Sequence, residues 1–138
     1  MIVLDTNVLS EIMRPAPEPK VVSWVDAVPT SEVAISAVTM AEILYGVGLM
    51  PEGRRRQRLM SIAEAIFAHD FDGRILPFDA SAAVEYVAVV LQRQASGHPI
   101  SMADAQIAAV CRAHECTLAT RNTRDFAGAG LNLIDPWR

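Results

Sequence analysis

Four acidic residues occupy positions suited to metal-assisted hydrolysis. Asp5 follows the apolar run that opens the chain, and Glu42 and Asp104 each stand alone in long uncharged stretches. Asp125 closes a polar segment near the end of the chain. Isolated carboxylates are costly to bury unless a positive partner satisfies them. Because Lys20 is the only lysine, a divalent cation is the partner that this pattern favours.

Carboxylate oxygens are the ligands that Mg²⁺ prefers, and this ion usually combines one or two of them with waters and a substrate phosphate. Two ions about 3.5–4 Å apart can stabilise both the attacking and the leaving oxygen of a phosphodiester. The nucleophile is then a metal-activated water, so no serine, cysteine or lysine nucleophile is required. The pattern is therefore typical of phosphodiester hydrolysis.

Each acid also has a purely structural explanation. Asp5 could cap the helix that follows it, and Asp125 could be a loop or cap residue. Asp104 could complete a capping box that Ser101 begins. Glu42 is harder to explain in this way, because a helix dipole offers only ~0.3–1 kcal/mol against the burial of an unpaired charge. All four explanations must hold together for the metal site to be excluded.

The composition predicts one domain that spans residues 1–138. Hydrophobic residues make up 51% of these 138 residues and charged residues 20%. The apolar excess favours a well-buried sheet and a subunit interface. The net charge of −4 argues against a general electrostatic attraction to nucleic acid, so any such binding would depend on local basic patches.

We expect a cytoplasmic protein without a membrane segment. Asp5 and Glu11 interrupt the opening apolar run, which also lacks the basic start of a signal peptide. Glu42 lies at the centre of the apolar stretch Val33–Met50, which favours a strand followed by a buried helix. The two cysteines and three histidines show no zinc-binding spacing, so we expect reduced cysteines and no zinc.

Short apolar runs alternate with helical patterns, which predicts an α/β fold with a parallel sheet covered on both faces. The expected strands are Met1–Leu4, Val33–Ser36, Arg74–Phe78, Thr117–Ala119 and Leu131–Ile134. The expected helices are Asn7–Met13, Lys20–Val28, Val38–Leu49, Glu52–Ala68, Ser81–Gln94 and Ser101–His114.

This topology would bring the four acids together. Ligands bind beyond the carboxyl ends of parallel strands. We expect Asp5 and Asp125 directly after strands, and Glu42 and Asp104 early in helices, so all four should lie at that edge. The convergence is an inference from the order of elements, not from spacing alone.

Four motifs, in order, resemble those of PIN-domain proteins. They are the opening Met1–Glu11, the isolated Glu42, Ala103-Asp104-Ala105, and Ala119–Phe126. The resemblance covers the whole chain and is strongest to VapC-type toxins of toxin–antitoxin pairs, in the FitB-like branch. It implies a three-layer α/β/α sandwich with a mainly parallel central sheet.

The resemblance also implies an endoribonuclease that depends on Mg²⁺ or Mn²⁺. The catalytic, metal-binding acids of the family match Asp5, Glu42, Asp104 and Asp125. Positions that often support the fourth acid match Thr120 and Asn122, and Thr6 and Asn7 are weaker candidates for support. The implied partners are an RNA substrate, a second copy of the chain, and a cognate antitoxin of the ribbon-helix-helix type whose tail enters the toxin groove. Operator DNA would be bound only through the antitoxin.

An arginine cluster is the main basic feature, formed by Arg54, Arg55, Arg56 and Arg58. Arginine at a helix start opposes the helix dipole, so the cluster is not placed for helix stability. It could hold RNA phosphates or acidic antitoxin residues, or it could be a solvated helix start. The two tryptophans, Trp24 and Trp137, are expected to be packing residues rather than base-stacking platforms.

The sequence leaves two kinds of rival function open, a phosphate-handling domain and a non-cleaving PIN-like subunit. A haloacid-dehalogenase-like phosphatase also has an acidic motif after its first strand, but Asn7 replaces the second acid and no lysine follows Lys20. Phospho-acceptor receiver domains need the same late basic residue. The second rival is a PIN-like subunit of a DNA-binding complex that does not cleave.

Overall fold

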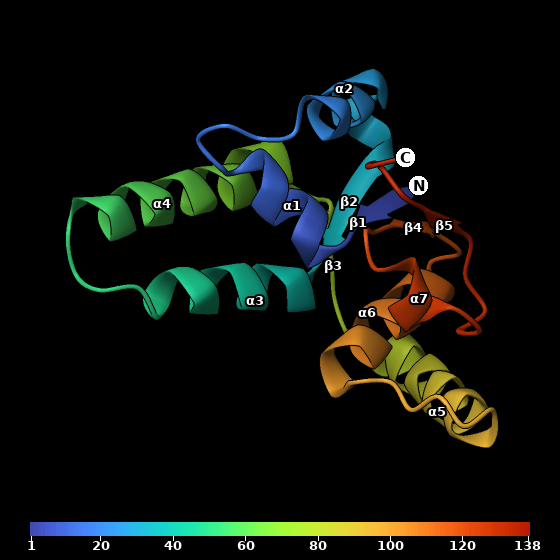
Figure 1. The fold of residues 1–138 in the computed structure, drawn as a ribbon. Helices are drawn as coiled ribbons and strands as arrows, with labels where there is room; N and C mark the ends of the chain where they lie inside the picture. Colours follow the sequence, from blue (N-terminus) through green and yellow to red (C-terminus); the bar gives the residue numbers. More distant parts are fainter.

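A five-stranded parallel sheet lies at the centre of the computed structural model, which describes residues 1–138 (Figure 1). The strand order is β3-β2-β1-β4-β5, and all four neighbouring pairs are parallel. The strands are β1 (Ile2–Leu4), β2 (Val33–Ser36), β3 (Ile75–Leu76), β4 (Thr117–Ala119) and β5 (Leu133–Ile134). The predicted α/β class is confirmed.

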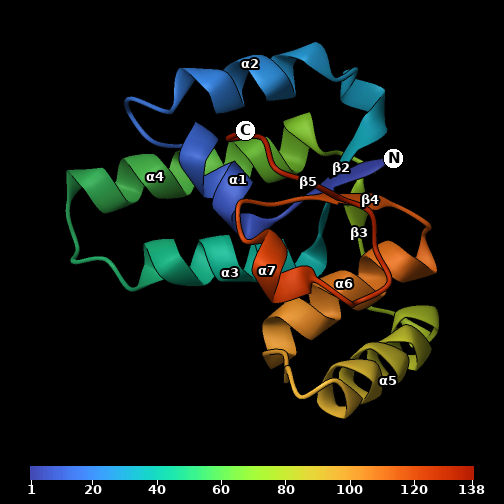
Figure 2. The same ribbon diagram turned by 45° about the vertical axis from the view of Figure 1, so that its right-hand side comes forward.

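Helices cover both faces of this sheet. Helices α1 to α4 lie on one side of the sheet and α5 to α7 on the other, as both orientations of the ribbon show (Figures 1 and 2). Their bounds are α1 (Thr6–Ile12), α2 (Pro19–Ala27), α3 (Ala37–Gly48), α4 (Arg54–Ala65), α5 (Ala80–Ala95), α6 (Met102–Ala113) and α7 (Thr123–Phe126). A 3-10 turn spans Thr30–Glu32, and a π-helical turn over Ile66–Asp70 extends α4.

The strands alternate their side chains between two hydrophobic cores. Val3 and Leu118 point into the core beneath α5, α6 and α7, whereas Leu4 and Ala119 point into the core beneath α1 to α4. This alternation is the two-residue period of a strand, and each core contains eleven buried residues. The predicted α/β/α sandwich is therefore confirmed.

Side-chain caps start helices at the carboxyl edge of the sheet. Asp5, directly after β1, caps α1 by accepting from the Thr6 N–H. Ser36, the last residue of β2, caps α3 by accepting from the Thr39 N–H. Both caps leave little chain between strand and helix, so the first turns of α1 and α3 lie beside each other at this edge.

The predicted elements all form, although β3 and β5 are shorter than expected, and three further details differ. The helix expected over Glu52–Ala68 begins at Arg54, because Gly53 takes a φ of 152° that interrupts it. Helix α7 was not predicted, since four residues are too few to show a helical period. Asp125 lies in α7 and does not directly follow β4, so its predicted position was wrong.

No helix in the structure is both long enough and apolar enough to cross a membrane. The apolar stretch Val33–Met50 divides between β2 and α3, as predicted.

Candidate active site

Asp5 is the most enclosed of the four acids, with 4% of its surface exposed. Its carboxylate accepts hydrogen bonds from the Thr6 N–H at 2.8 Å, the Asn7 amide at 3.1 Å and the Thr120 hydroxyl at 2.7 Å. The register pairs Leu4 with Ala119, so the next residues, Asp5 and Thr120, meet beyond the strand ends. Three donors from two strand ends therefore fix this carboxylate.

The pKa of Asp5 is raised from 3.8 to about 6. Burial is the largest cause, and the charges of Asp104 and Glu42 add to it, while the hydrogen bonds from Thr120 and Thr6 act in the opposite direction. Two other acids are thus close enough to make ionisation of Asp5 harder. A cation near the carboxylate would remove this cost.

Glu42 is exposed, so our premise that it is a buried unpaired charge was wrong. It lies in the second turn of α3, and its carboxylate accepts a hydrogen bond from the Thr6 hydroxyl at 2.6 Å. The uncharged sequence around it arises because α3 buries one face and presents apolar residues to a neighbouring groove, not because Glu42 itself is enclosed.

A network of three hydroxyl groups connects Glu42 to the protein interior. The Thr6 hydroxyl lies 3.1 Å from that of the fully buried Thr39, which in turn lies 3.3 Å from the Ser36 hydroxyl. The network joins the end of β2 to the start of α1. It therefore fixes Thr6, and through Thr6 the carboxylate of Glu42, relative to the sheet edge. Thr39 and Ser36 were not among the predicted site residues, because buried hydroxyls carry no sequence signal of their own.

Asp104 is half-buried in the first turn of α6. Its backbone N–H donates to the Ser101 hydroxyl at 3.2 Å, so Ser101 caps α6, but no bond from the Ser101 N–H to the Asp104 carboxylate completes the predicted capping box. Burial is the main cause that raises the pKa of Asp104, and the charges of Asp125 and Glu42 raise it further. The Ser101 hydroxyl therefore serves as the cap, while Asp104 lines the cavity described below.

Asp125 is exposed on α7, and its charge is near enough to raise the pKa of Asp104. It does not line the cavity that the other acids share. The buried Arg93 side chain holds its backbone, donating to the Asp125 carbonyl at 2.5 Å and to the Ala127 carbonyl at 3.1 Å. Arg93 was not predicted, because a lone arginine late in a helix does not indicate which loop it holds.

Three of the four acids face one cavity of about 510 Å³. Asp5, Glu42 and Asp104 line it, which confirms for these three the convergence expected from the topology. The other lining residues are Thr6, Asn7, Ser10, Glu11, Arg14, Arg121, Asn122 and Trp137. The Glu11 carboxylate forms an ion pair with Arg14 at 3.2 Å and accepts a hydrogen bond from the Glu18 N–H, so it stabilises the local fold.

The cavity offers oxygen ligands of the type that a hard cation prefers, but too few of them lie close together to hold an ion alone. All three acids offer oxygen, and no histidine or cysteine lines the cavity, which suits Mg²⁺ or Mn²⁺ and not zinc. No three Asp, Glu, His or Cys side chains lie close enough together to hold an ion by themselves. An ion here would therefore need waters or substrate oxygens to complete its shell, which is common for Mg²⁺.

The supporting residues are arranged differently from what we predicted. Thr120 donates to Asp5, not to Asp125. The Asn122 N–H donates to the Thr120 hydroxyl, and its carbonyl accepts from the Asp125 N–H at 3.0 Å. The candidates considered weaker, Thr6 and Asn7, make the direct contacts to Glu42 and Asp5.

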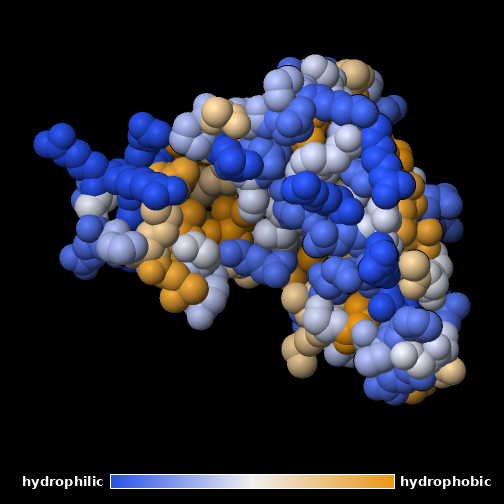
Figure 3. Space-filling model, in the orientation of Figure 1, coloured by the Kyte–Doolittle hydropathy of each residue, from blue (hydrophilic) through white to orange (hydrophobic).

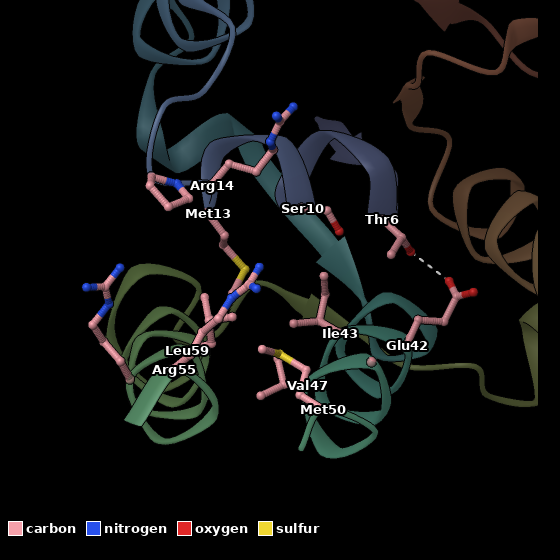
Figure 4. Close-up of a pocket in the computed structure, with 13 residues that line it drawn as sticks. Thr6, Ser10, Met13, Arg14, Glu42, Ile43, Val47, Met50, Arg55 and Leu59 are labelled. Carbon is pink, nitrogen blue, oxygen red and sulfur yellow. Dashed lines mark hydrogen bonds between the residues drawn. The ribbon is translucent and has the colours of Figure 1, made fainter. Parts of the chain in front are cut away.

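An apolar groove of about 250 Å³ adjoins the acidic cavity, between α1, α3 and α4 (Figure 4). Ile43 and Val47 of α3, and Met50 just after this helix, face Met13 and Leu59 across it. Hydrophobic side chains are visible in this hollow on the molecular surface (Figure 3). Thr6, Ser10, Arg14 and Glu42 line both the groove and the cavity, so the two are continuous.

The arginine cluster divides between two surfaces. Arg55 and Arg58 line the groove together with Arg14, whereas Arg56 lines a separate cavity and Arg54 lines neither of these two. None of the four lines the acidic cavity. The helix start has no side-chain cap, which agrees with the inference that the arginines are not there for helix stability.

Arg121 and Trp137 are further residues of the cavity that we did not assign to the site. Trp137 packs against the core beneath α1 to α4, as predicted, but it also lines the acidic cavity. The guanidinium of Arg121 lies 5.1 Å from the centre of the Trp137 ring. The sequence gives no signal for this pairing because sixteen positions separate the two residues.

Comparison with known proteins places the chain in a family. A model of the PIN domain matches residues 2–130. The chain is 42% identical to the VapC ribonuclease Y4jK of Sinorhizobium fredii over 99% of its length and 98% of the relative. It is 40% identical to the toxin FitB of Neisseria gonorrhoeae over 99% of both chains.

Solved structures agree with this assignment. A structure of FitAB bound to a DNA fragment is 40% identical and superposes with a TM-score of 0.95 over 100% of this chain and 96% of that one. The crystal structure of FitAcB from Neisseria gonorrhoeae is 37% identical, with a TM-score of 0.89 over 100% of this chain and 99% of that one. These matches leave the phosphatase and receiver alternatives without support. The chain belongs to the PIN-domain family.

Proposed function

We propose that this protein is a metal-dependent endoribonuclease that acts as the toxin of a toxin–antitoxin pair. One observation carries the proposal: Asp5, Glu42 and Asp104, from three separate parts of the chain, line one cavity at the carboxyl edge of the sheet. Relatives named as a VapC ribonuclease and a FitB toxin, matched over nearly their whole length, support the same conclusion.

The side chains prepare this cavity for a cation and an RNA phosphate. Three donors hold Asp5, and Thr6 holds Glu42, so little reorganisation is needed when a ligand arrives. Asp5, Glu42 and Asp104 would hold Mg²⁺ or Mn²⁺, with Asp125 acting from beside Asp104. When bound, such an ion supplies positive charge that activates water and stabilises the charge developing on a phosphodiester.

Cleavage of RNA by the purified, antitoxin-free protein tests this proposal. We expect cleavage with Mg²⁺ or Mn²⁺ that EDTA abolishes. Asp5→Asn, Glu42→Gln and Asp104→Asn should each reduce the rate at least ~100-fold, because each removes a charge from the cavity and keeps its shape. Asp125→Asn should reduce it less, because Asp125 lies outside the cavity lining. Absence of cleavage with either ion would favour the alternative of a non-catalytic PIN-like subunit.

We infer that the tail of a cognate antitoxin, encoded in the neighbouring reading frame, occupies the groove. The groove combines an apolar floor with three arginines, Arg14, Arg55 and Arg58, which suits an amphipathic segment with acidic residues. A tail lying there would reach the wall that Thr6 and Glu42 share with the acidic cavity. The antitoxin would be of the ribbon-helix-helix type, and operator DNA would be bound through it. This activity on RNA implies a cytoplasmic protein.

We further infer a homodimer in which a second copy covers α5. Val84, Val87 and Leu91 recur on one face of this helix and are 72%, 54% and 60% exposed. Exposed apolar residues gathered on one helix face usually mark an interface. The face carries no charge, so a two-fold axis could bring it against itself without repulsion.

A further inference from the structure

We propose that Arg121 and Trp137 form a subsite for an RNA nucleotide at the rim of the acidic cavity, in which Arg121 binds a phosphate and the Trp137 ring orients it. The inference rests on the proposed ribonuclease function. Both residues line the cavity that Asp5, Glu42 and Asp104 share. The guanidinium of Arg121 lies over the face of the Trp137 ring, 5.1 Å from its centre.

Arg121 is a cation that no carboxylate neutralises. The three ion pairs of the structure are Arg14–Glu11, Arg112–Glu85 and Arg138–Asp135. Arg121 therefore shares a cavity with several acids and yet pairs with none of them, and its side chain is exposed. Stacking on an aromatic face leaves the N–H groups at the edge of the guanidinium free, and these are the groups that bind a phosphate in a bidentate way.

The site residues themselves hold this pair in place. The backbone N–H of Arg121 donates to the Asn7 side-chain oxygen at 3.2 Å, and the Asn7 side-chain amide donates to the Asp5 carboxylate. On the other side, the backbone N–H of Trp137 donates to the Asp135 carboxylate at 2.9 Å, and the ring packs against the hydrophobic core. Two hydrogen bonds therefore fix the backbone of Arg121 relative to Asp5, and the Trp137 ring positions its guanidinium.

Charge explains why such a subsite is needed. A cavity lined by three carboxylates in a chain of net charge −4 repels a polyanion. A fixed cation at the rim lowers this barrier for the phosphate beside the one that is cut. The antitoxin is a less suitable ligand, because Arg121 does not line the apolar groove, where Arg14, Arg55 and Arg58 supply the positive charge.

Direct binding of RNA tests the subsite without relying on cleavage. The probe is a fluorescein-labelled single-stranded RNA of twelve nucleotides and mixed sequence. The parent protein carries D5N and D104N, which lower the repulsion and prevent cleavage, and intact RNA on a gel after the titration verifies this. Arg121→Gln should weaken binding about tenfold and reduce the slope of log affinity against log salt by about 0.7, the value for one phosphate on a single strand.

Arg124→Gln is the matched control. It removes the same charge three residues away, from an exposed side chain that lines neither the cavity nor the groove. It should change affinity less than twofold. Trp137→Leu should weaken binding about 5- to 100-fold if bases also stack on the ring, and at least twofold if the ring only orients Arg121. Circular dichroism melting of each variant verifies that it is folded.

A second readout follows Trp137 itself. With Trp24→Phe in the parent, Trp137 is the only tryptophan, so its fluorescence should change when the RNA binds. This change should disappear when Arg121→Gln is added at the same RNA concentration.

Each outcome separates the subsite from the proposed function. If Arg121→Gln and Trp137→Leu bind RNA like Arg124→Gln while the wild type cleaves RNA, the subsite is wrong and the function stands. If the variants lose binding as expected but the wild type does not cleave, the subsite stands and the catalytic function is wrong. If the parent does not bind the RNA at 50 mM salt, the subsite is wrong, and cleavage by the wild type decides the function separately. If Arg121→Gln weakens only a co-purified antitoxin complex, the pair belongs to a protein interface and the proposal is overturned.

Discussion

A single carboxylate, that of Asp5, both caps α1 and faces the acidic cavity. The two explanations of Asp5, as a helix cap and as a site residue, therefore do not exclude each other, because one carboxylate does both. The residue type and position of Asp5, Glu42 and Asp104 could be predicted, because apolar sequence isolates them. Their hydrogen-bond partners could not, since Thr120 and Thr39 reach the site only through strand register and helix packing.

The raised pKa of Asp5 predicts an unusual dependence of stability on pH. A carboxyl whose folded pKa is about 6, against 3.8 when unfolded, holds its proton more tightly in the folded chain. Its contribution to stability is full below pH 3.8 and is lost as the pH rises through about 6. The loss amounts to about 3 kcal/mol at most.

Melting curves in EDTA measure this effect. Asp5→Asn should melt above the wild type at pH 7.5, and the advantage should vanish or reverse at pH 4.5. Millimolar Mg²⁺ or Mn²⁺ should stabilise the wild type at pH 7.5, and less at pH 5, where protons compete for the carboxylates. A wild type that melts above Asp5→Asn at pH 7.5 in EDTA, or that gains nothing from either ion, would contradict the proposed site.

Replacement of Thr120 by Val isolates one hydrogen bond to Asp5. The Thr120 hydroxyl donates at 2.7 Å and lowers the pKa of this buried carboxylate, so its loss should raise that pKa further. We expect destabilisation of about 1.5–3 kcal/mol at pH 7.5, as for a hydrogen bond to a charged group, and less at pH 4.5. Thr117→Val in the same strand is the control, because the Thr117 hydroxyl makes no such bond. Equal losses at both pH values would show that only packing had changed.

The elements, more than the loops, determine which residues can meet. Strand order and parallel register bring the ends of β1, β2 and β4 together. Alternating apolar and helical patterns predicted the parallel sheet, but not the order of its strands or their register. Helix α7 could not be predicted in the same way, and the position of Asp125 was wrong as a result. Short helices depend on tertiary contacts such as those of Arg93, and sequence periodicity does not record such contacts.

The two surfaces at the start of α4 give a prediction at the same scale. Arg55→Gln with Arg58→Gln should weaken antitoxin binding and flatten its salt dependence, because both arginines line the groove. Arg54→Gln with Arg56→Gln removes the same charge outside the groove and should have a smaller effect. Affinities can be measured by calorimetry at two salt concentrations. Equal losses in the two double variants would mean that charge alone, and not the groove, is responsible.

At the scale of the whole molecule, the apolar residues lie in two kinds of place, the buried cores and one exposed helix face. The two cores contain one set, and the exposed face of α5 carries another. A lone folded chain would present Val84, Val87 and Leu91 to water, which is why we infer that a second copy covers them.

Val87→Asp should convert this dimer to a monomer, since it places two like charges near the two-fold axis. Light scattering at micromolar concentration should then give the mass of one chain, against two for the wild type. Ser61→Asp adds the same charge to an exposed position on α4 and should leave the dimer intact. A monomeric wild type, or a Val87→Asp variant that stays dimeric, would contradict this interface.

The wall shared by the groove and the cavity has a kinetic consequence. Thr6, Ser10, Arg14 and Glu42 border both spaces, so a segment lying along the groove and a substrate entering the cavity would require the same surface. Inhibition from the groove should therefore be competitive: the apparent KM for substrate should rise with inhibitor while kcat stays constant. An excess of substrate would then relieve the inhibition, without any change in the shape of the enzyme.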